Sequence, residues 1–273
     1  MNIFKDTMSE MTYKQIEILV QQEAIVLFPV GIIEEHGPHL PLGTDIYLSY
    51  QQAHDVWEEL NVMGIPCVIA PPFYLGGVQA LTRHFPGTFA FSKETIMACI
   101  EEYLENLDRF GFKRVVIFND HGDGLHISAI VEAIKNANQK LELRAYWMEY
   151  EYELKEHGFS GEEDYILKLT TMPFEEMFRI SKMPEDEFDV HAGAFETATM
   201  REIYPEAVRE GEVAGLEPTF LKGEQIGKWC DGEAEDKMLI PNGYVGDPGS
   251  SQYIKTNLKE ADRRIARDIA EQL

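Results

Sequence analysis

The stretch GIIEEHGPHLPLGTD, residues 31–45, decides how the rest of this chain is interpreted. It follows the apolar run AIVLF at residues 24–28, which is typical of a buried strand. Glu34 and His36 are two residues apart, so an extended backbone presents both side chains on one face. The glycines and prolines that follow bend the chain, which allows Asp45 to reach the same point. Two carboxylates and an imidazole that converge at a strand end predict a divalent metal site of the zinc or manganese kind.

A simpler interpretation of the same stretch is a turn with solvated polar side chains. Asp45 on its own is better explained as a helix cap, because a helical pattern starts at Ile46. The metal interpretation rests on the set of residues and not on any one of them.

Composition bounds the class of protein. The 273 residues are 44% hydrophobic and 11% aromatic, which suits one large domain with a sizeable core. The net charge of -24 argues against nucleic acid and anionic membranes as partners. Three widely separated cysteines give no disulfide framework. With no signal peptide and no apolar run of membrane-spanning length, we expect a cytoplasmic protein.

Strands alternate with helices through the first 150 residues. This order predicts an α/β fold, with a mostly parallel central sheet and helices on both faces. The long loop 74–88 has no hydrophobic period and carries His84, which is either functional or a surface histidine. We expect strands at 24–28, 67–70, 114–118 and 141–148, and helices at 12–22, 45–60, 92–110 and after residue 124.

The second half of the chain has weaker patterns. We expect a loop or exposed extension at 149–164, a short helix at 173–182, a helix from His191 to about Ile203 and a last helix from Ser250. Residues 204–240 contain many glycines, prolines and acids and form an excursion, which is a β-ribbon, a lid or an oligomer contact. No repeat or linker divides the chain, so residues 1–273 form a single domain with insertions.

A second pair of polar residues repeats the spacing of the first. His121 and Asp123 follow the apolar run at 114–118, just as Glu34 and His36 follow theirs. The carboxyl ends of parallel strands form ligand sites, so the two pairs can meet with Asp45. Five ligands exceed the three of a catalytic zinc and suit two metals that share a carboxylate, for which Asp45 is the natural bridge. Two ions about 3.5–4 Å apart can deprotonate a bridging water and polarise a carbonyl.

A third cluster lies at HAGAFE, residues 191–196. His191 and Glu196 are too far apart for one helical face, but both reach one site if His191 precedes the helix and Glu196 lies in its first turn. The alternatives are a capping histidine and an acid that favours a helix N-terminus.

These motifs resemble those of the creatininase family of metal-dependent amidohydrolases. The resemblance covers GIIEEHGPHLPLGTD, FPGT at 85–88, NDHGDG at 119–124, HAGAFET at 191–197 and GDPGSS at 246–251, in family order over nearly the whole chain. It implies a three-layer αβα sandwich, a homo-oligomer that is often a hexamer, and two divalent ions of zinc, manganese or both.

The resemblance also implies roles for single residues. Glu34, Asp45 and His121 would hold one metal, and His36, Asp45 and Asp123 would hold the other. His191 would transfer a proton to the leaving group, and Glu196 would support the ligands or add to them.

Three residues depart from the family pattern. Glu35 stands where Gln is common, Asp123 where creatininase has Glu, and Gly124 where Asn is common. Asp123 is therefore the least secure ligand, with Glu196 as its substitute.

The sequence thus predicts a dinuclear metal-dependent hydrolase that acts on a small polar substrate, most simply at the C–N bond of a cyclic amide. One alternative is hydrolytic C–C ring opening of a keto-inositol or related cyclic diketone. The other is a non-catalytic oligomeric scaffold stabilised by metal, which the distance of all three cysteines from the candidate ligands argues against.

Overall fold

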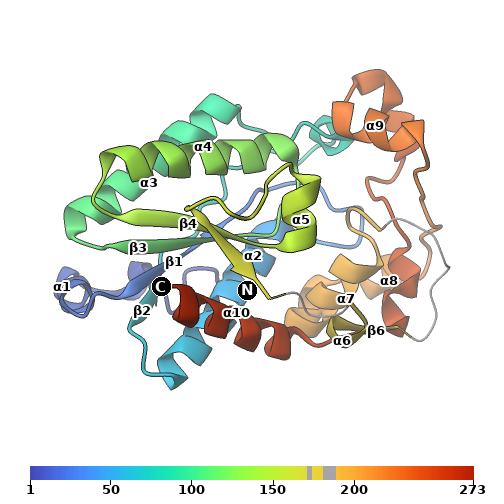
Figure 1. The fold of residues 1–273 in the computed structure, drawn as a ribbon. Helices are drawn as coiled ribbons and strands as arrows, with labels where there is room; N and C mark the ends of the chain where they lie inside the picture. The colour runs from blue at the N-terminus through green and yellow to red at the C-terminus, as the bar shows by residue number, and fades with distance from the viewer. Residues whose placement is uncertain (171–173, 181–188) are drawn as a thin grey trace.

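The computed structural model describes residues 1–170, 174–180 and 189–273. A five-stranded sheet in the order β2-β1-β3-β4-β5 forms its centre, and every pair of neighbouring strands is parallel (Figure 1). The three-layer α/β prediction is confirmed. The strands are β1 (Ile25–Val30), β2 (Cys67–Ile69), β3 (Arg114–Asn119), β4 (Arg144–Tyr150) and β5 (Ile166–Leu169).

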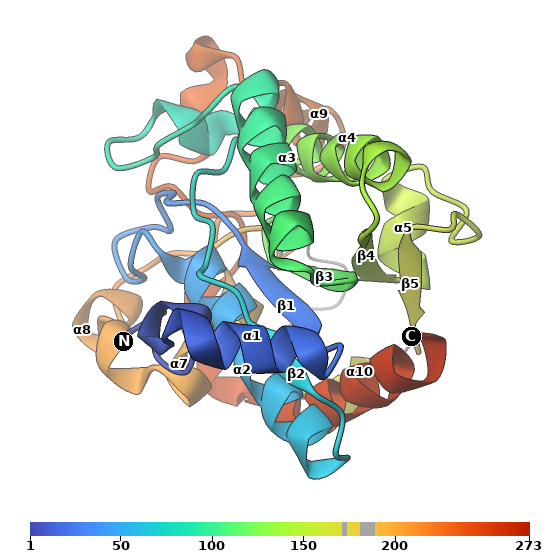
Figure 2. The ribbon, with the colours of Figure 1, turned by 90° about the vertical axis from the view of Figure 1, so that its left-hand side faces the viewer.

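Helices cover both faces of the sheet (Figures 1 and 2). On one face lie α3 (Lys93–Phe110) and α4 (Gly124–Lys140), with α1 (Tyr13–Gln21) packed against the same core. On the other lie α2 (Thr44–Val62) and α10 (Leu258–Gln272). Side chains of β1 alternate between the two layers: Val26 joins the first core and Leu27 the second. This is why the run at 24–28 is apolar throughout.

The residues at the two ends of α3 cap the helix as the sequence predicts. The Ser92 hydroxyl accepts the backbone N–H of Thr95, which satisfies a donor of the first turn. Gly111 ends the helix with a φ of 107°, a conformation that glycine adopts without a steric cost.

The second half of the chain differs from expectation in several elements. The segment 149–164, expected to be a loop, contains α5 (Glu151–Glu156), and β5 follows it. The short helix expected at 173–182 lies partly outside the described residues, and those described form α6 (Phe174–Met177) and β6 (Phe178–Ile180). The last helix starts at residue 258 and not at 250, because a 3-10 helix at Pro248–Tyr253 and β7 (Ile254–Thr256) precede it. Strand β7 pairs antiparallel with β6.

The helix predicted after His191 is present as α7 (Ala194–Ile203). The structure describes all of residues 204–240, which fold as short helices joined by loops. No residue of this segment lies in a strand, so the β-ribbon alternative is wrong. The segment forms 3-10 helices at Pro205–Ala207 and Ala234–Leu239, together with α8 (Glu210–Val213) and α9 (Glu224–Asp231). Among the described residues, no helix combines the length and the apolarity that crossing a membrane requires.

The order of the strands creates a crevice between β1 and β3. From β1 the chain moves outward to β2 on one side, and it then returns to place β3 on the other side of β1. Connections that leave adjacent parallel strands in opposite directions open a gap at the carboxyl edge, where ligands bind in folds of this kind. Residues 31–45 follow β1 and residues 120–123 follow β3, so both polar stretches line this gap.

Candidate metal centre

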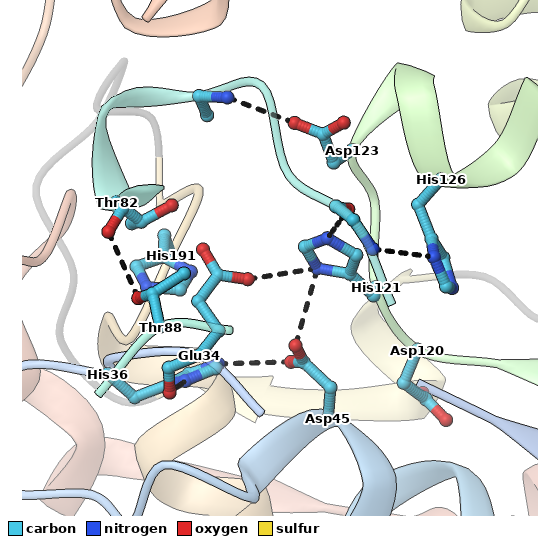
Figure 3. A network of polar contacts seen from close by, with 12 residues as sticks. Glu34, His36, Asp45, Thr82, Thr88, Asp120, His121, Asp123, His126 and His191 are labelled. Carbon is cyan, nitrogen blue, oxygen red and sulfur yellow. Dashed lines mark hydrogen bonds and ion pairs between the residues drawn. The ribbon is translucent and has the colours of Figure 1, made fainter. Parts of the chain in front are cut away.

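Glu34, Asp45 and His121 form one buried group at the crevice (Figure 3). The Nδ1 atom of His121 lies 3.3 Å from a carboxylate oxygen of Glu34 and 3.3 Å from Oδ2 of Asp45. The other ring nitrogen, Nε2, donates to the carbonyl of Gly77 at 3.0 Å. Because a carbonyl only accepts, Nδ1 is the nitrogen whose lone pair can face a metal ion, as in many metal sites.

His36, His191 and Glu196 form a second group beside the first. His36 donates from Nδ1 to the carbonyl of Glu34 at 3.0 Å, which leaves Nε2 at 3.0 Å from Oδ1 of Asp45 and 3.9 Å from Oε2 of Glu196. His191 donates from Nε2 to the carbonyl of Glu35 at 2.8 Å. The rings of His36 and His191 lie 4.3 Å apart. Each imidazole thus keeps one ring nitrogen that is not bonded to a backbone carbonyl.

Asp45 stands between the two groups, in the first turn of α2. Its Oδ1 faces His36 and its Oδ2 faces His121 (Figure 3). Oδ2 of Asp45 and Oε2 of Glu34 have no hydrogen-bond partner although both atoms are buried. A buried anionic oxygen is costly unless a cation lies next to it; the His121 ring, 3.3 Å from both oxygens, supplies that charge when it is protonated, and a divalent ion would supply it otherwise. The donor set therefore fits divalent ions.

The pKa values of these side chains describe the site without a metal ion, when protons bind to the same atoms. Burial alone would lower the pKa of His121, but the charges of Glu34 and Asp45 outweigh burial and raise it to about 9. Burial is also the largest single influence on His36 and lowers its pKa, but the charge and hydrogen bond of Asp45 together with the charges of Glu196 and Glu34 outweigh burial, so the pKa is raised. Burial raises the pKa of Glu34 and brings that of Glu196 to about 7. A metal ion has to displace these protons, so its binding strengthens as the pH rises.

Asp123 lies close to this centre but belongs to neither group. It is the N-cap of α4, where Oδ1 accepts the N–H of Leu125 at 2.9 Å. Its Oδ2 accepts the N–H groups of Gln79 at 2.9 Å and Ala80 at 3.1 Å. Figure 3 shows the carboxylate pointing toward that loop. In this geometry Asp123 anchors residues 79–80 beside the site.

The start of α7 positions His191 and Glu196. His191 precedes the helix and Glu196 lies in its first turn, the arrangement that allows both to reach one site. Asp189 accepts the N–H of Ala194 at 2.5 Å, and a Cβ at Gly193 would lie 2.3 Å from the same carboxylate, so a side chain there would have to displace Asp189. Glu196 is held by the N–H of Ala192 at 2.5 Å. His39, in contrast, bonds to Thr197 on this helix and is absent from both groups.

A model of the creatininase family, described as creatinine amidohydrolase, matches residues 9–257. This chain belongs to the creatininase family. Creatinine amidohydrolase of Pseudomonas putida is 25% identical over 208 residues, which cover 73% of this chain and 72% of that protein. The 3-dehydro-scyllo-inosose hydrolase of Thermotoga maritima is 24% identical and covers 86% and 68%. A mycofactocin precursor peptide peptidase of Mycolicibacterium smegmatis is 32% identical over 135 residues, 48% of this chain and 51% of that one.

Solved creatininase structures share the fold. One crystal structure of creatinine amidohydrolase superimposes with a TM-score of 0.67 at 20% identity and covers 98% of this chain and 97% of that chain. A manganese form gives 0.69 at 21% identity, with 97% and 96% covered. The creatininase family and these relatives are hydrolases, and this chain is a hydrolase. The alternative of a non-catalytic scaffold is therefore wrong.

In this creatininase-family chain the candidate metal centre opens into a cavity of about 540 Å³. Helix α9 contributes Trp229 and Asp231 to the wall, and the Trp229 ring lies 5.7 Å from the His191 ring. His84 donates to the carbonyl of Gly232 at 2.7 Å, which ties the end of α9 to loop 74–88. A Cβ at Gly232 would lie 1.8 Å from the carbonyl oxygen of Gln79, so glycine is required for this contact. His84 thus holds the wall of the cavity without lining it.

Sequence reasoning missed a hydrogen-bonded chain behind His121. His126 donates from Nε2 to Asn119 at 3.1 Å, and its Nδ1 accepts the N–H of Gly77 at 3.4 Å. Gly77 in turn accepts from His121, so the chain fixes the direction of that ligand. Burial lowers the pKa of His126 and keeps its ring neutral, as this arrangement requires. The double glycine at 76–77 is the available signal, since a Cβ at Gly77 would lie 2.7 Å from a backbone oxygen.

Proposed function

We propose that this protein is a dinuclear metal-dependent hydrolase that cleaves a C–N bond of a polar amide. One observation carries the proposal: the two oxygens of the buried Asp45 carboxylate face two separate groups of ligand atoms. A single ion does not need such an arrangement, whereas two ions that share a carboxylate do. The forms of solved creatininases that are described as Mn and as Zn–Zn support these metals.

The first ion would be held by Glu34, Asp45 and His121. The second would be held by His36, Asp45 and Glu196, because the Glu196 carboxylate is near His36 and faces the site. The sequence names Asp123 for the second ion. That assignment remains a prediction, and three backbone N–H groups compete for the Asp123 carboxylate.

The ions would act as Lewis acids on the carbonyl and would lower the pKa of a water molecule at the site. His191 supplies the proton transfer. Its pKa is lowered to about 3 by burial, with the neighbouring charge of His36 as the next cause, so the ring is neutral at physiological pH. Nε2 already donates to the carbonyl of Glu35, so Nδ1 is the atom that is left for proton transfer. It would take a proton from the attacking water and pass it to the departing nitrogen.

Cyclic amides are the first substrates to test, because the matching family model and a relative that covers 73% of this chain are both described as creatinine amidohydrolase. A second candidate is hydrolytic opening of a keto-inositol ring. The hydrolase of 3-dehydro-scyllo-inosose, which covers 86% of this chain, favours it. Water would attack a carbonyl in both reactions, and they differ in whether nitrogen or carbon leaves.

The test is metal content per chain by plasma mass spectrometry, on protein purified without chelator, followed by assays of cyclic amides and keto-inositols. We expect about two equivalents of zinc, manganese or a mixture. Glu196→Ala should lose one equivalent, and Asp123→Ala should keep both. The opposite result would move the second ion to Asp123. A single equivalent in the parent would refute the dinuclear site.

A further inference from the structure

A second hollow adjoins the cavity of the metal centre. It has a volume of about 270 Å³, and Gly124 and His157 line both hollows. The two hollows are therefore adjacent at these residues. Beyond that point the second hollow runs along α4, with Ser128, Val131 and Lys135 in its wall.

The wall residues of α4 form one face of the helix. Gly124, Ser128, Val131 and Lys135 follow one another at intervals of four, three and four residues, which is the spacing of side chains on a single helical face. A helix rises 1.5 Å per residue, so Gly124 and Lys135 are separated by about 16 Å along its axis. That length equals about five residues of an extended peptide. A compact cyclic substrate bound at the metal centre would leave the hollow along α4 empty.

The chain leaves space free at Gly122 and Gly124, beside the point where the two hollows adjoin. A Cβ built at Gly122 or at Gly124 would meet no atom within 4 Å, and neither residue has a left-handed φ that demands glycine. The absence of side chains at these two positions keeps the passage clear. A larger side chain at Gly124 would narrow the passage without a clash inside the protein.

The two ends of this path differ in charge. The residues that line the metal cavity include Asp120, Asp123 and Asp231 but no Lys or Arg. Lys135 is exposed at the far end and makes no hydrogen bond or ion pair with any residue that the structure describes, whereas the neighbouring Glu132 is paired with Lys93 at 2.6 Å. In a chain with a net charge of -24, an unpaired ammonium beside a hollow can attract an anion.

We propose that the substrate is an amide with a polar arm, which passes Gly124 and His157, follows α4 and ends in an anionic group at Lys135. This inference rests on the proposed hydrolase function and adds the shape and charge of the substrate. The reacting carbonyl lies at the metal centre, and the arm spans up to about 16 Å. The anionic end is a carboxylate or a phosphate, since Lys135 can pair with either.

Binding to the zinc-loaded protein tests the groove without requiring turnover. The probes are alanine peptides of two and six residues with free or amidated carboxyl ends, and N-formyl aminoalkyl phosphates of matched length, measured by isothermal titration calorimetry. We expect the six-residue acid to bind about two- to fivefold more tightly than its amide, as for a solvent-exposed ion pair. Lys135→Glu should remove that preference. Gly124→Leu should remove the advantage of long probes over short ones.

Gly211→Leu is the matched control, because Gly211 also has no atom within 4 Å of a built Cβ and lies in α8 away from both hollows. It should leave the dependence on length and charge as in the parent. A stronger response to the phosphate probes that also requires Lys135 would identify the anion as a phosphate ester. Equal affinity for all lengths and ends, or equal effects of the Gly124 and Gly211 variants, would overturn the proposal.

Different results would refute the proposed hydrolase function and the proposed groove. If the zinc-loaded protein hydrolyses no amide yet binds long acids through Lys135, the hydrolytic assignment to amides is refuted and the groove stands. If it hydrolyses compact amides and shows no dependence on length, the groove is refuted and the hydrolase stands.

Discussion

Glu35 gives the sharpest test of the electrostatics around the metal centre. Its side chain is only 7% exposed. Oε2 accepts the N–H of Gly37 at 3.0 Å, while the buried Oε1 has no hydrogen-bond partner. Burial raises the pKa of this carboxyl from 4.5 to about 8, against the backbone hydrogen bond that lowers it. We predict that Glu35→Gln stabilises the metal-free protein at pH 8, because glutamine keeps the acceptor for Gly37 and carries no charge.

The direction follows from proton linkage. The native state of the parent binds the Glu35 proton more tightly than the unfolded chain does, so the stability that this proton contributes is fully present below pH 4.5 and is lost as the pH rises through about 8. Linkage over this interval gives a loss of about 2–4 kcal/mol between pH 5 and pH 8. The glutamine variant has no proton to lose at this position.

Urea unfolding of the chelated parent and variant at pH 5, 6.5 and 8 measures the difference. The two free energies of unfolding should nearly agree at pH 5, and the variant should be more stable by about 2–4 kcal/mol at pH 8. Glu105→Gln, on the exposed side of α3, is the control for removing a surface carboxylate and should shift stability little at any pH. Parallel profiles for the parent and Glu35→Gln would show that the buried carboxyl is not protonated in the native state, and the reasoning would fail.

Three further predictions concern the centre and its wall. Zinc or manganese at 100 times its Kd should raise the Tm of the chelated protein by about 5 °C for a chain of this length. The Asp45→Ala variant should lose most of this rise. If Asp45→Ala held as much metal as the parent, the bridging role of Asp45 would be refuted. His191→Ala should retain its metal by plasma mass spectrometry and lose turnover, so an unchanged rate would remove His191 from proton transfer. Gly232→Ala places a Cβ 1.8 Å from the Gln79 carbonyl and should displace α9, lowering activity with metal retained; full activity would show that α9 tolerates the shift.

Most of the central sheet could be predicted because a strand buried on both faces is apolar throughout. Strands β1 and β3 are buried on both faces, so they appear in the sequence as continuous apolar runs. Strand β5, Ile166–Leu169, contains Lys168 and follows an acidic segment, so no such run marks it. The 3-10 helix before α10 depends on contacts with α7, which are distant in sequence and leave no local periodicity.

The candidate site could be predicted only in part, for a comparable reason. The spacing of Glu34 and His36 after β1 brings both side chains into the candidate metal centre, but the same spacing at His121 and Asp123 is followed directly by α4. An aspartate at a helix N-terminus has backbone N–H groups as competing partners, and the carboxylate accepts one of them. The chain from Asn119 through His126 to Gly77 joins three separate segments, which no spacing in a single sequence can indicate.

The directions of the three imidazoles depend on main-chain carbonyls, those of Glu34, Glu35 and Gly77. Every residue type supplies such a carbonyl, so the tautomer of each ring is independent of the side chains at those positions. The wall of the cavity, by contrast, includes side chains outside the candidate centre, such as Leu125 of α4 and Ile226 and Trp229 of α9. New substrate preferences can therefore arise by exchanging wall residues, while the backbone carbonyls keep the three imidazole rings in the same orientation.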